Sequence, residues 1–246
     1  MATHGGPNIV EDGLVFYVDA ANKDSYVSGS LSTFNLINPS ITGSVHNDVD
    51  YSFNNAGIWE FDGTDDNINL GDNDIFSLCS GSAGTNGSDA PNSIDMWFNT
   101  SETGWQDLMG KVGGGVYEWR IAAIPESNII RLQTFNSGSG VGGRRNYNGS
   151  TSILTNTWHN VIITYDGAAT NSSVKMYLNG QPINVSANQN GTYLGMDNTD
   201  KDCTISGFSA GFLLTGKMST VKMYKDKVLS ASEVKQNYNA LKSRFE

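Results

Sequence analysis

Three aspartates within five residues are the densest cluster of chemically active side chains in the sequence. They are Asp62, Asp65 and Asp66, in the stretch FDGTDDNINLG between two short apolar runs. Ca²⁺ takes six to eight oxygen ligands, and carboxylates along a flexible loop can supply several of them. Asp and Gly also favour tight turns, because Asp hydrogen-bonds its own backbone and Gly accepts a positive φ. The stretch predicts a structural turn or a calcium site, with catalysis the least favoured use.

Aromatic side chains in the middle of the chain are the second group of residues that could bind a ligand. Aromatic rings stack on the apolar faces of sugars, and planar polar side chains can fix the hydroxyl groups. The candidate carbohydrate-binding residues are Trp105, Tyr117, Trp119, Arg144 and Tyr147. The basic spot at 143–146 is expected to be a solvated hairpin tip, because polar, glycine-rich stretches between strands are usually loops.

Motifs of other catalytic chemistries do not occur in the sequence. The histidines, His4, His46 and His159, lack metal-ligand spacing, and there is no G-x-S-x-G or phosphate-binding glycine motif. Cys79 and Cys203 also lack metal spacing, so the two form one disulfide or remain two thiols. Calcium is therefore the one cofactor that the sequence suggests.

Charge and hydropathy exclude two classes of partner. The formal net charge is −10, from 25 acidic and 15 basic residues, whereas a nucleic-acid-binding surface is basic. No apolar run approaches the roughly 18 residues of a membrane span. The polar, glycine-rich start does not resemble a signal peptide, so we expect synthesis in a cytosol without an N-terminal export route.

Short alternating strands are expected to position these side chains. Runs such as 57–61, 67–70, 93–100, 107–112, 117–123, 129–135, 157–167 and 174–183 alternate or are rich in β-formers, with turn residues between them. Asn179-Gly180 predicts a type I′ hairpin. Ser230 and Glu233 form a capping box that begins one helix, with Val234, Tyr238, Leu241 and Phe245 on its apolar face.

These patterns predict an all-β antiparallel sandwich with a short C-terminal helix. We divide the chain into an N-terminal arm (1–12), one sandwich domain (13–229) and a helix packed on it (230–246). The loop at 77–92 is a candidate binding rim, because long loops on rigid β-scaffolds often carry function. The arm is expected to add to the sheet edge of a neighbouring subunit.

Five stretches in register resemble the laminin-G-like branch of the concanavalin A-like lectin/glucanase superfamily. They are LVFYVDAAN, FDGTDDNINLG, WHNVIITYDG, VKMYLNGQPI and the terminal GKMSTVKMYKDKVLSASEVKQNYNALKSRF. The resemblance implies a jelly-roll of two antiparallel sheets that binds sugars, in members that bind them, on its concave face or rim loops. The two ends of the chain also look like structural proteins of tailed phages, especially phages of marine cyanobacteria.

The same resemblance makes glycoside hydrolysis the least favoured function. Glycoside hydrolases use two carboxylates, and the laminarinase-like branch carries them in a pattern similar to E-I-D-I-E-F. In the corresponding stretch here, Ser93 and Trp97 stand at the two glutamate positions and Asp95 alone remains. We therefore expect a protein that is not an enzyme, in which Asp95→Asn leaves folding intact.

The leading functional hypothesis is a non-enzymatic virion protein with a lectin-like domain, either a capsid decoration protein or a fibre or tail component. Its partners would be capsid or fibre subunits and, through carbohydrate binding, host-surface glycans. The alternatives are an adhesin for host glycans and, less favoured, a glycoside hydrolase.

Overall fold

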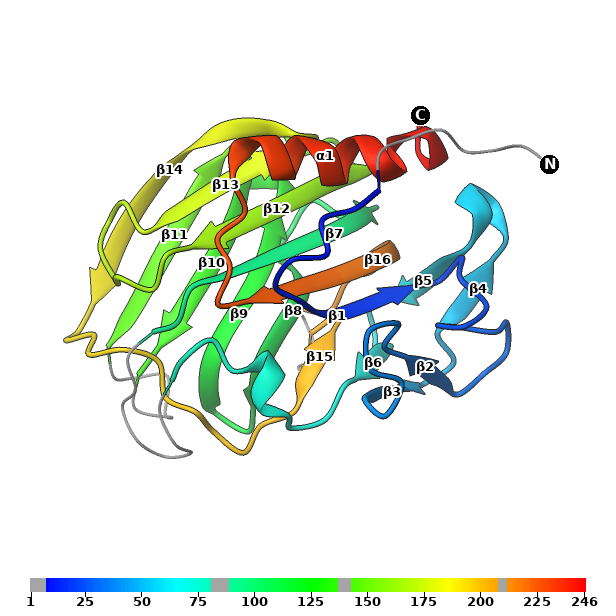
Figure 1. Ribbon diagram of the computed structural model, residues 1–246, viewed down its shortest axis with the longest axis horizontal. Coiled ribbons are helices and arrows are strands. Elements are labelled where there is room, and N and C mark those ends of the chain that lie inside the picture. Colours follow the sequence, from blue (N-terminus) through cyan, green and yellow to red (C-terminus); the bar gives the residue numbers. More distant parts are fainter. Residues whose placement is uncertain (1–7, 81–88, 137–142, 208–211) are drawn as a thin grey trace.

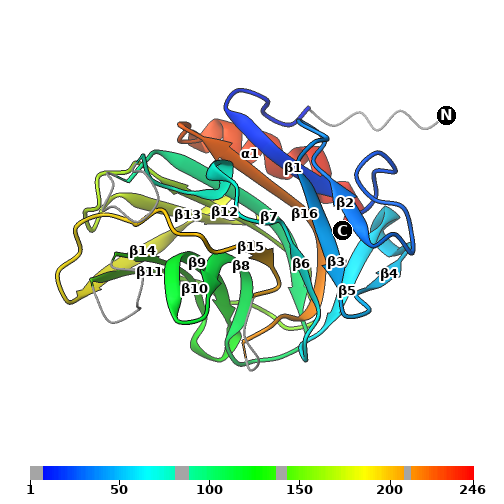
Figure 2. The same ribbon diagram turned by 90° about the horizontal axis from the view of Figure 1, so that it is seen from below.

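Residues 8–80, 89–136, 143–207 and 212–246 are described by the computed structural model of the chain. Their strands follow one antiparallel path that folds into two layers, sheet A and sheet B (Figures 1 and 2). The predicted all-β jelly-roll sandwich with a C-terminal helix is thereby confirmed.

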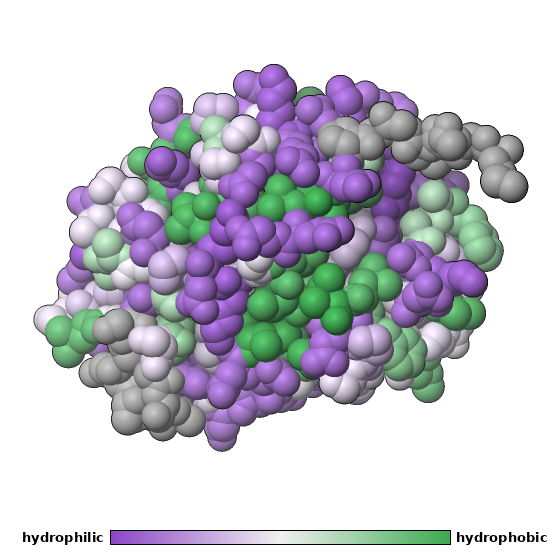
Figure 3. Space-filling view, in the orientation of Figure 1, coloured by the Kyte–Doolittle hydropathy of each residue, from purple (hydrophilic) through white to green (hydrophobic). Residues whose placement is uncertain are grey.

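Sheet A carries the C-terminal helix on its outer face (Figure 1). Its strands in spatial order are β4 (Asp50–Ser52), β5 (Ile58–Asp62), β16 (Thr215–Lys225), β7 (Asn92–Thr100), β12 (His159–Tyr165), β13 (Val174–Leu178) and the start of β14 (Gln181–Asn190), and β1 (Leu14–Asp19) also pairs with β16. Figure 3 shows this side, with hydrophilic residues over the helix and an apolar patch below it.

Sheet B is the second layer and shares one strand with sheet A. Its strands in order are β2 (Ser32–Phe34), β3 (Thr42–His46), β6 (Asn67–Asn69), β15 (Cys203–Ile205), β8 (Gln106–Gly113), β9 (Val116–Ile124), β10 (Ile129–Phe135), β11 (Arg144–Ser150) and the end of β14. Since β14 pairs with β13 through its first residues and with β11 through its last, it joins the two layers along one edge.

The hydrophobic core lies between the sheets. Alternate side chains of each strand point inward, among them Met96 and Val161 from sheet A and Ile121 and Leu132 from sheet B, all at most 1% exposed. Each large apolar side chain buried in this way contributes about 1.5–3 kcal/mol. Cys79 and Cys203 lie in this core as thiols and are not joined to each other.

The local signals for turn and helix are confirmed. Asn179 and Gly180 have φ of 50° and 73°, as a type I′ turn requires, and Leu178 pairs with Gln181 across it. Helix α1 (Ala231–Leu241) begins with the predicted capping box between Ser230 and Glu233. Among the described residues, no helix is long and apolar enough to cross a membrane.

The expected hairpin tip at 143–146 is wrong. Arg144 and Arg145 belong to strand β11, which pairs with β10 on one side and β14 on the other. The other helices within the described ranges are single 3₁₀ turns: η1 (Asn54–Ala56), η2 (Asp74–Phe76), η3 (Pro125–Ser127) and η4 (Lys242–Arg244). Of the expected arm, 1–7 lies outside the described residues, as does 81–88 of the expected rim loop.

Candidate functional site

Polar side chains cover the face of sheet B that points away from the core. In β9, Trp119, Ile121 and Ala123 point into the core, so Arg120 points outward, and the same alternation applies to β10, β11 and β14. We call this surface the ladder face. Its residues are Trp105, Tyr117, Arg120, Arg131, Gln133, Arg144, Asn146, Asn148 and Asn188.

Side-chain hydrogen bonds run across four adjacent strands of the ladder face. Arg120 Nε donates to Gln133 Oε1 (2.5 Å), and Gln133 Nε2 donates to Asn146 Oδ1 (2.5 Å). Asn146 Nδ2 donates in turn to Asn188 Oδ1 (2.6 Å). Backbone register places these four residues directly opposite one another. The row therefore holds a fixed sequence of donors and acceptors on a rigid sheet.

Trp105 lies at one side of the ladder face against two arginines. The guanidinium carbons of Arg120 and Arg131 lie 4.5 and 5.0 Å from the centre of its ring, within cation–π range. The indole Nε1 donates to Asp107 Oδ1 at 2.6 Å. This contact fixes the ring plane, and Trp105 remains partly exposed.

Asp107 is a buried carboxyl beside this tryptophan. Burial raises its pKa to about 6, although Arg120 at 3.7 Å and the Trp105 indole oppose the rise. Burial likewise lowers the pKa of Arg120 and of Arg131. Asp107 and the two guanidinium groups are therefore partly removed from water.

The five predicted sugar-contacting residues separate into two groups. Trp105, Tyr117 and Arg144 lie on the ladder face, where Tyr117 packs on Phe135 with ring centres 5.0 Å apart. Trp119 and Tyr147 are 0% exposed and point into the core, and Trp119 Nε1 donates to the carbonyl of Phe76. These two side chains cannot reach a ligand in solvent and do not belong to the site.

The sequence prediction missed Arg120, Arg131, Gln133 and Asn146. A signal was present for Arg120, Arg131 and Gln133, because the alternation in YEWRIAAI and IIRLQTF places these polar residues on the face opposite the aliphatic ones. Choosing residues by aromatic type instead of by face selected Trp119 in place of its neighbour Arg120.

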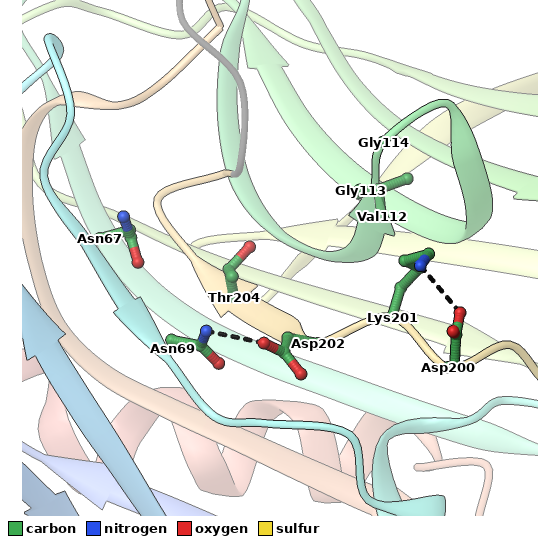
Figure 4. A pocket seen from close by; sticks show the side chains of 9 residues that line it. All are labelled: Asn67, Asn69, Val112, Gly113, Gly114, Asp200, Lys201, Asp202 and Thr204. Atoms are coloured by element: carbon green, nitrogen blue, oxygen red, sulfur yellow. Dashed lines mark hydrogen bonds and ion pairs between the residues drawn. The ribbon is translucent and has the colours of Figure 1, made fainter.

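A hollow of about 420 Å³ adjoins the ladder face at strands β6, β15 and β8 (Figure 4). Asn69 and Thr204 stand in the same cross-strand row as Arg120, with Gly110 between them and Arg120. Asn69 Nδ2 donates to Asp202 Oδ2 at 2.8 Å, and Lys201 pairs with Asp200 at 2.9 Å. The hollow therefore extends the polar surface of sheet B with both signs of charge.

A buried ion pair holds the loops beside this hollow. Lys111 Nζ lies 2.7 Å from Glu118 Oε1 and 2.8 Å from Asp72 Oδ1, and both Lys111 and Glu118 are inaccessible to solvent. Lys111 also donates to the carbonyl of Thr199, whose backbone N–H donates to Glu118 Oε1. The pair therefore connects strands β8 and β9 to the segments at 72 and 199.

The aspartate cluster forms the turn between β5 and β6. Carboxylate oxygens of Asp62, Asp65 and Asp66 all lie within 4.8 Å of one another. Asp66 Oδ2 accepts from the backbone N–H of Asp62 at 2.9 Å, and Asp62 Oδ1 accepts from the N–H of Thr64 at 2.7 Å. Burial, together with the neighbouring carboxylates, raises the pKa of Asp66 to about 6. Two of the three carboxylates thus have structural roles in the turn.

Substitution of Asp65 can distinguish a structural turn from a calcium site in this cluster. It is exposed and its carboxylate makes no hydrogen bond with the described residues, so Asp65→Asn should change stability by less than about 0.5 kcal/mol. We expect millimolar Ca²⁺ to leave the melting temperatures of the wild type and of Asp65→Asn unchanged. A calcium-induced rise in the wild type that Asp65→Asn abolishes would contradict the turn assignment and establish a metal site.

Asp95 lies on the opposite side of the molecule from the ladder face. It is fully buried on the outer face of sheet A, where its Oδ2 lies 3.2 Å from Lys222 Nζ and accepts from Asn237 of α1 at 3.0 Å. Its Oδ1 accepts from Asn160 at 2.8 Å. These contacts change the expectation for Asp95→Asn: we now expect the variant to be destabilised, because Lys222 would remain buried without its counter-ion.

A family model described as the concanavalin A-like lectin/glucanases superfamily matches residues 62–235. The comparison with curated proteins returns no match.

Solved structures of two kinds have a similar fold. The receptor-binding domain of botulinum neurotoxin type G matches with a TM-score of 0.58 and 12% identity, over 92% of this chain and 50% of that one. The binding domain of botulinum neurotoxin serotype D gives 0.59 and 13%, over 92% and 51%. A Trypanosoma rangeli sialidase gives 0.60 and 14%, over 94% and 33%. The chain spans about half of each toxin domain and a third of the sialidase, and the likeness shows the fold.

Proposed function

The chain belongs to the concanavalin A-like lectin/glucanase superfamily, and from this premise we propose that it is a carbohydrate-binding domain whose ligand lies on the ladder face. The observation that carries the proposal is the hydrogen-bonded row from Arg120 to Asn188, flanked by the partly exposed ring of Trp105. Fold alone does not define a ligand, so the proposal rests on these side chains.

The chemistry of this face suits a sugar. Trp105 offers the exposed part of its ring, held by the bond to Asp107. Asn148 and Asn188 offer amides that donate and accept, as hydroxyl groups require. Because the row is already hydrogen-bonded, these groups lose little conformational freedom when a ligand binds, which favours affinity.

We further propose that this face binds without catalysis. A glycosidase needs two carboxyl groups flanking the scissile bond. On strands β8 and β9 the carboxyl groups are Asp107 and Glu118, and Asp107 is held by Trp105 while Glu118 pairs with Lys111. Structural roles of this kind favour a binding domain over a hydrolase.

Trp105→Ala tests the proposal. The variant removes the ring that packs against Arg120 and Arg131, and we expect it to weaken glycan binding at least about tenfold, as loss of a central aromatic contact does. Binding is measured by titration with the glycans that a glycan array selects for the wild type. Phe53→Ala is the control, because Phe53 is a 77% exposed aromatic that does not belong to the ladder face. Equal loss in both variants would contradict the assignment, as would no loss in Trp105→Ala.

A more specific proposal concerns where the domain acts. The resemblance of both chain ends to virion proteins of tailed phages supports display on a phage particle, as a decoration, fibre or tail component that holds host-surface glycans. A labelled antibody against the chain, viewed on purified particles, tests this directly. Regular labelling of the head would indicate decoration, labelling of fibre tips would indicate an adhesin, and no labelling would refute the virion role.

A further inference from the structure

Arginine is concentrated on the ladder face of a protein that is otherwise acidic. The chain has a net charge of −10 and five arginines, of which Arg120, Arg131 and Arg144 lie on this one face. Strands β9, β10 and β11 together contain no lysine and one carboxyl group, that of Glu118, which is neutralised by Lys111. The three arginines therefore form a local positive area that overall charge does not explain.

The three arginines surround the amide row. Arg120 stands opposite Gln133, Arg131 stands two residues before Gln133 on the same strand, and Arg144 lies two residues before Asn146 on the next strand. With strands about 4.8 Å apart and about 3.4 Å per residue, the Cα atom of Arg120 lies roughly 8 Å from that of Arg131 and roughly 12 Å from that of Arg144, and the Cα atoms of Arg131 and Arg144 lie roughly 14 Å apart. Side chains as long as arginine can converge across these distances, above Gln133 and Asn146.

The guanidinium groups are oriented by their inner nitrogen atoms. Arg120 and Arg131 use Nε to donate to Gln133 and Asn148, at 2.5 and 2.7 Å. Within the part of the chain that the structure describes, no carboxylate or carbonyl accepts from the Nη atoms of Arg131. The nearest acid to Arg120 Nη1 is Asp107 at 3.7 Å. The Nη edge of Arg131 is therefore available to a planar anion, and Arg144 can add its Nη1, since its Nη2 lies 2.8 Å from the side-chain oxygen of Asn190 when that amide is oriented to accept.

We infer that the ligand of the ladder face is an acidic saccharide, whose anionic group binds the Nη edges of Arg131 and Arg144 while a sugar ring packs on Trp105. This inference rests on the proposed carbohydrate-binding function. Arginine binds a carboxylate or sulfate through two parallel hydrogen bonds, which fixes direction as well as charge. The pKa of Arg131 is lowered by burial and then by Arg144 and Arg120, so an anion placed among them relieves their mutual repulsion.

Dextran, carboxymethyl dextran and dextran sulfate test this inference, because they share a backbone and differ in charge. We expect the 246-residue chain to bind a charged form at least tenfold more tightly than dextran, and the preferred form distinguishes carboxylate from sulfate. Arg131→Gln and Arg144→Gln should each weaken that binding at least tenfold. Lys235→Gln removes the same charge from an exposed position on α1 and should leave binding unchanged.

Polyglutamate and Trp105→Ala complete the test. Polyglutamate should bind at least tenfold more weakly than the preferred dextran derivative, and equal binding would reduce the face to a general anion patch and overturn the inference. Equal binding of neutral and charged dextrans that Trp105→Ala abolishes would overturn the inference and leave the proposed function standing. Absence of binding to all three dextrans and to a glycan array would overturn both.

Discussion

Asp95→Asn is expected to lower the free energy of unfolding by about 3–5 kcal/mol, the usual cost of leaving one member of a buried ion pair without its partner. Asp95 and Lys222 are both inaccessible to solvent. The substitution would turn one oxygen that Lys222 and Asn237 share into an amide nitrogen, so that donors would face a donor. Urea unfolding at pH 7 measures the loss.

Two further variants show whether a loss of stability in Asp95→Asn comes from the unpaired Lys222. In Asp95→Asn combined with Lys222→Met, no buried charge remains unpaired, so most of the lost stability should return. Asp12→Asn is the matched control, because Asp12 pairs with Lys227 at the surface with 79% of its side chain exposed. Such a pair contributes about 0–1 kcal/mol. A change below 1 kcal/mol in Asp95→Asn would contradict the structural role assigned to the buried pair between β7 and β16.

Lys111→Met should cost a comparable 3–5 kcal/mol at pH 7, and the loss should shrink as the pH falls. Burial raises the pKa of Glu118, and Lys111 opposes that rise. Without Lys111 the folded-state pKa of Glu118 rises further above its unfolded value. The folded state then binds more protons than the unfolded state between these two values, so the free energy of unfolding of the variant increases from pH 7 toward pH 5.

Lys201→Met is the control for Lys111→Met. Lys201 lies in the neighbouring loop but pairs with Asp200, whose side chain is 81% exposed. Its replacement should change stability by less than about 1 kcal/mol at either pH. Urea titrations of both variants at pH 5 and pH 7 provide the comparison, and a pH-independent loss in Lys111→Met would contradict the role assigned to Glu118.

Local signals in the sequence were sufficient to predict most of the fold. The Asn179-Gly180 turn requires positive φ at two residues, and the capping box satisfies two backbone N–H groups, so each signal depends on neighbours in the chain. Strands β2, β3 and β4 were missed because STF, TGSVH and DYS consist mostly of Ser, Thr, Gly and Asp, so no apolar alternation marks them. Strand β11 was missed because RRNYNGS is polar on the side that carries the ladder face.

The candidate site was harder to predict because its residues lie close together only across strands. Nothing in the local sequence of Gln133 or Asn146 indicates that they are hydrogen-bonded partners on adjacent strands. Their pairing depends on the register of β10 and β11, which the whole sheet determines. The partner of Asp95 could not be predicted for the same reason, since Lys222 lies 127 residues further along the chain.

The pairing of β1 with β16 has a mechanical consequence. Leu14, where the chain enters β1, stands opposite Tyr224, near the point where it leaves β16. Residues 8–12 are held to α1 by hydrogen bonds from the Val10 N–H to Asn237 and from Gln236 to the Asn8 carbonyl. Once these bonds had broken, a force pulling Leu14 and Tyr224 apart would break the antiparallel hydrogen bonds of β1 and β16 one pair at a time. A force between one of these points and a ligand on the ladder face would instead be shared across both sheets. The domain should therefore resist a higher force when it is pulled between one end and its ligand than when it is pulled between its two ends, where β1 would separate from β16 first.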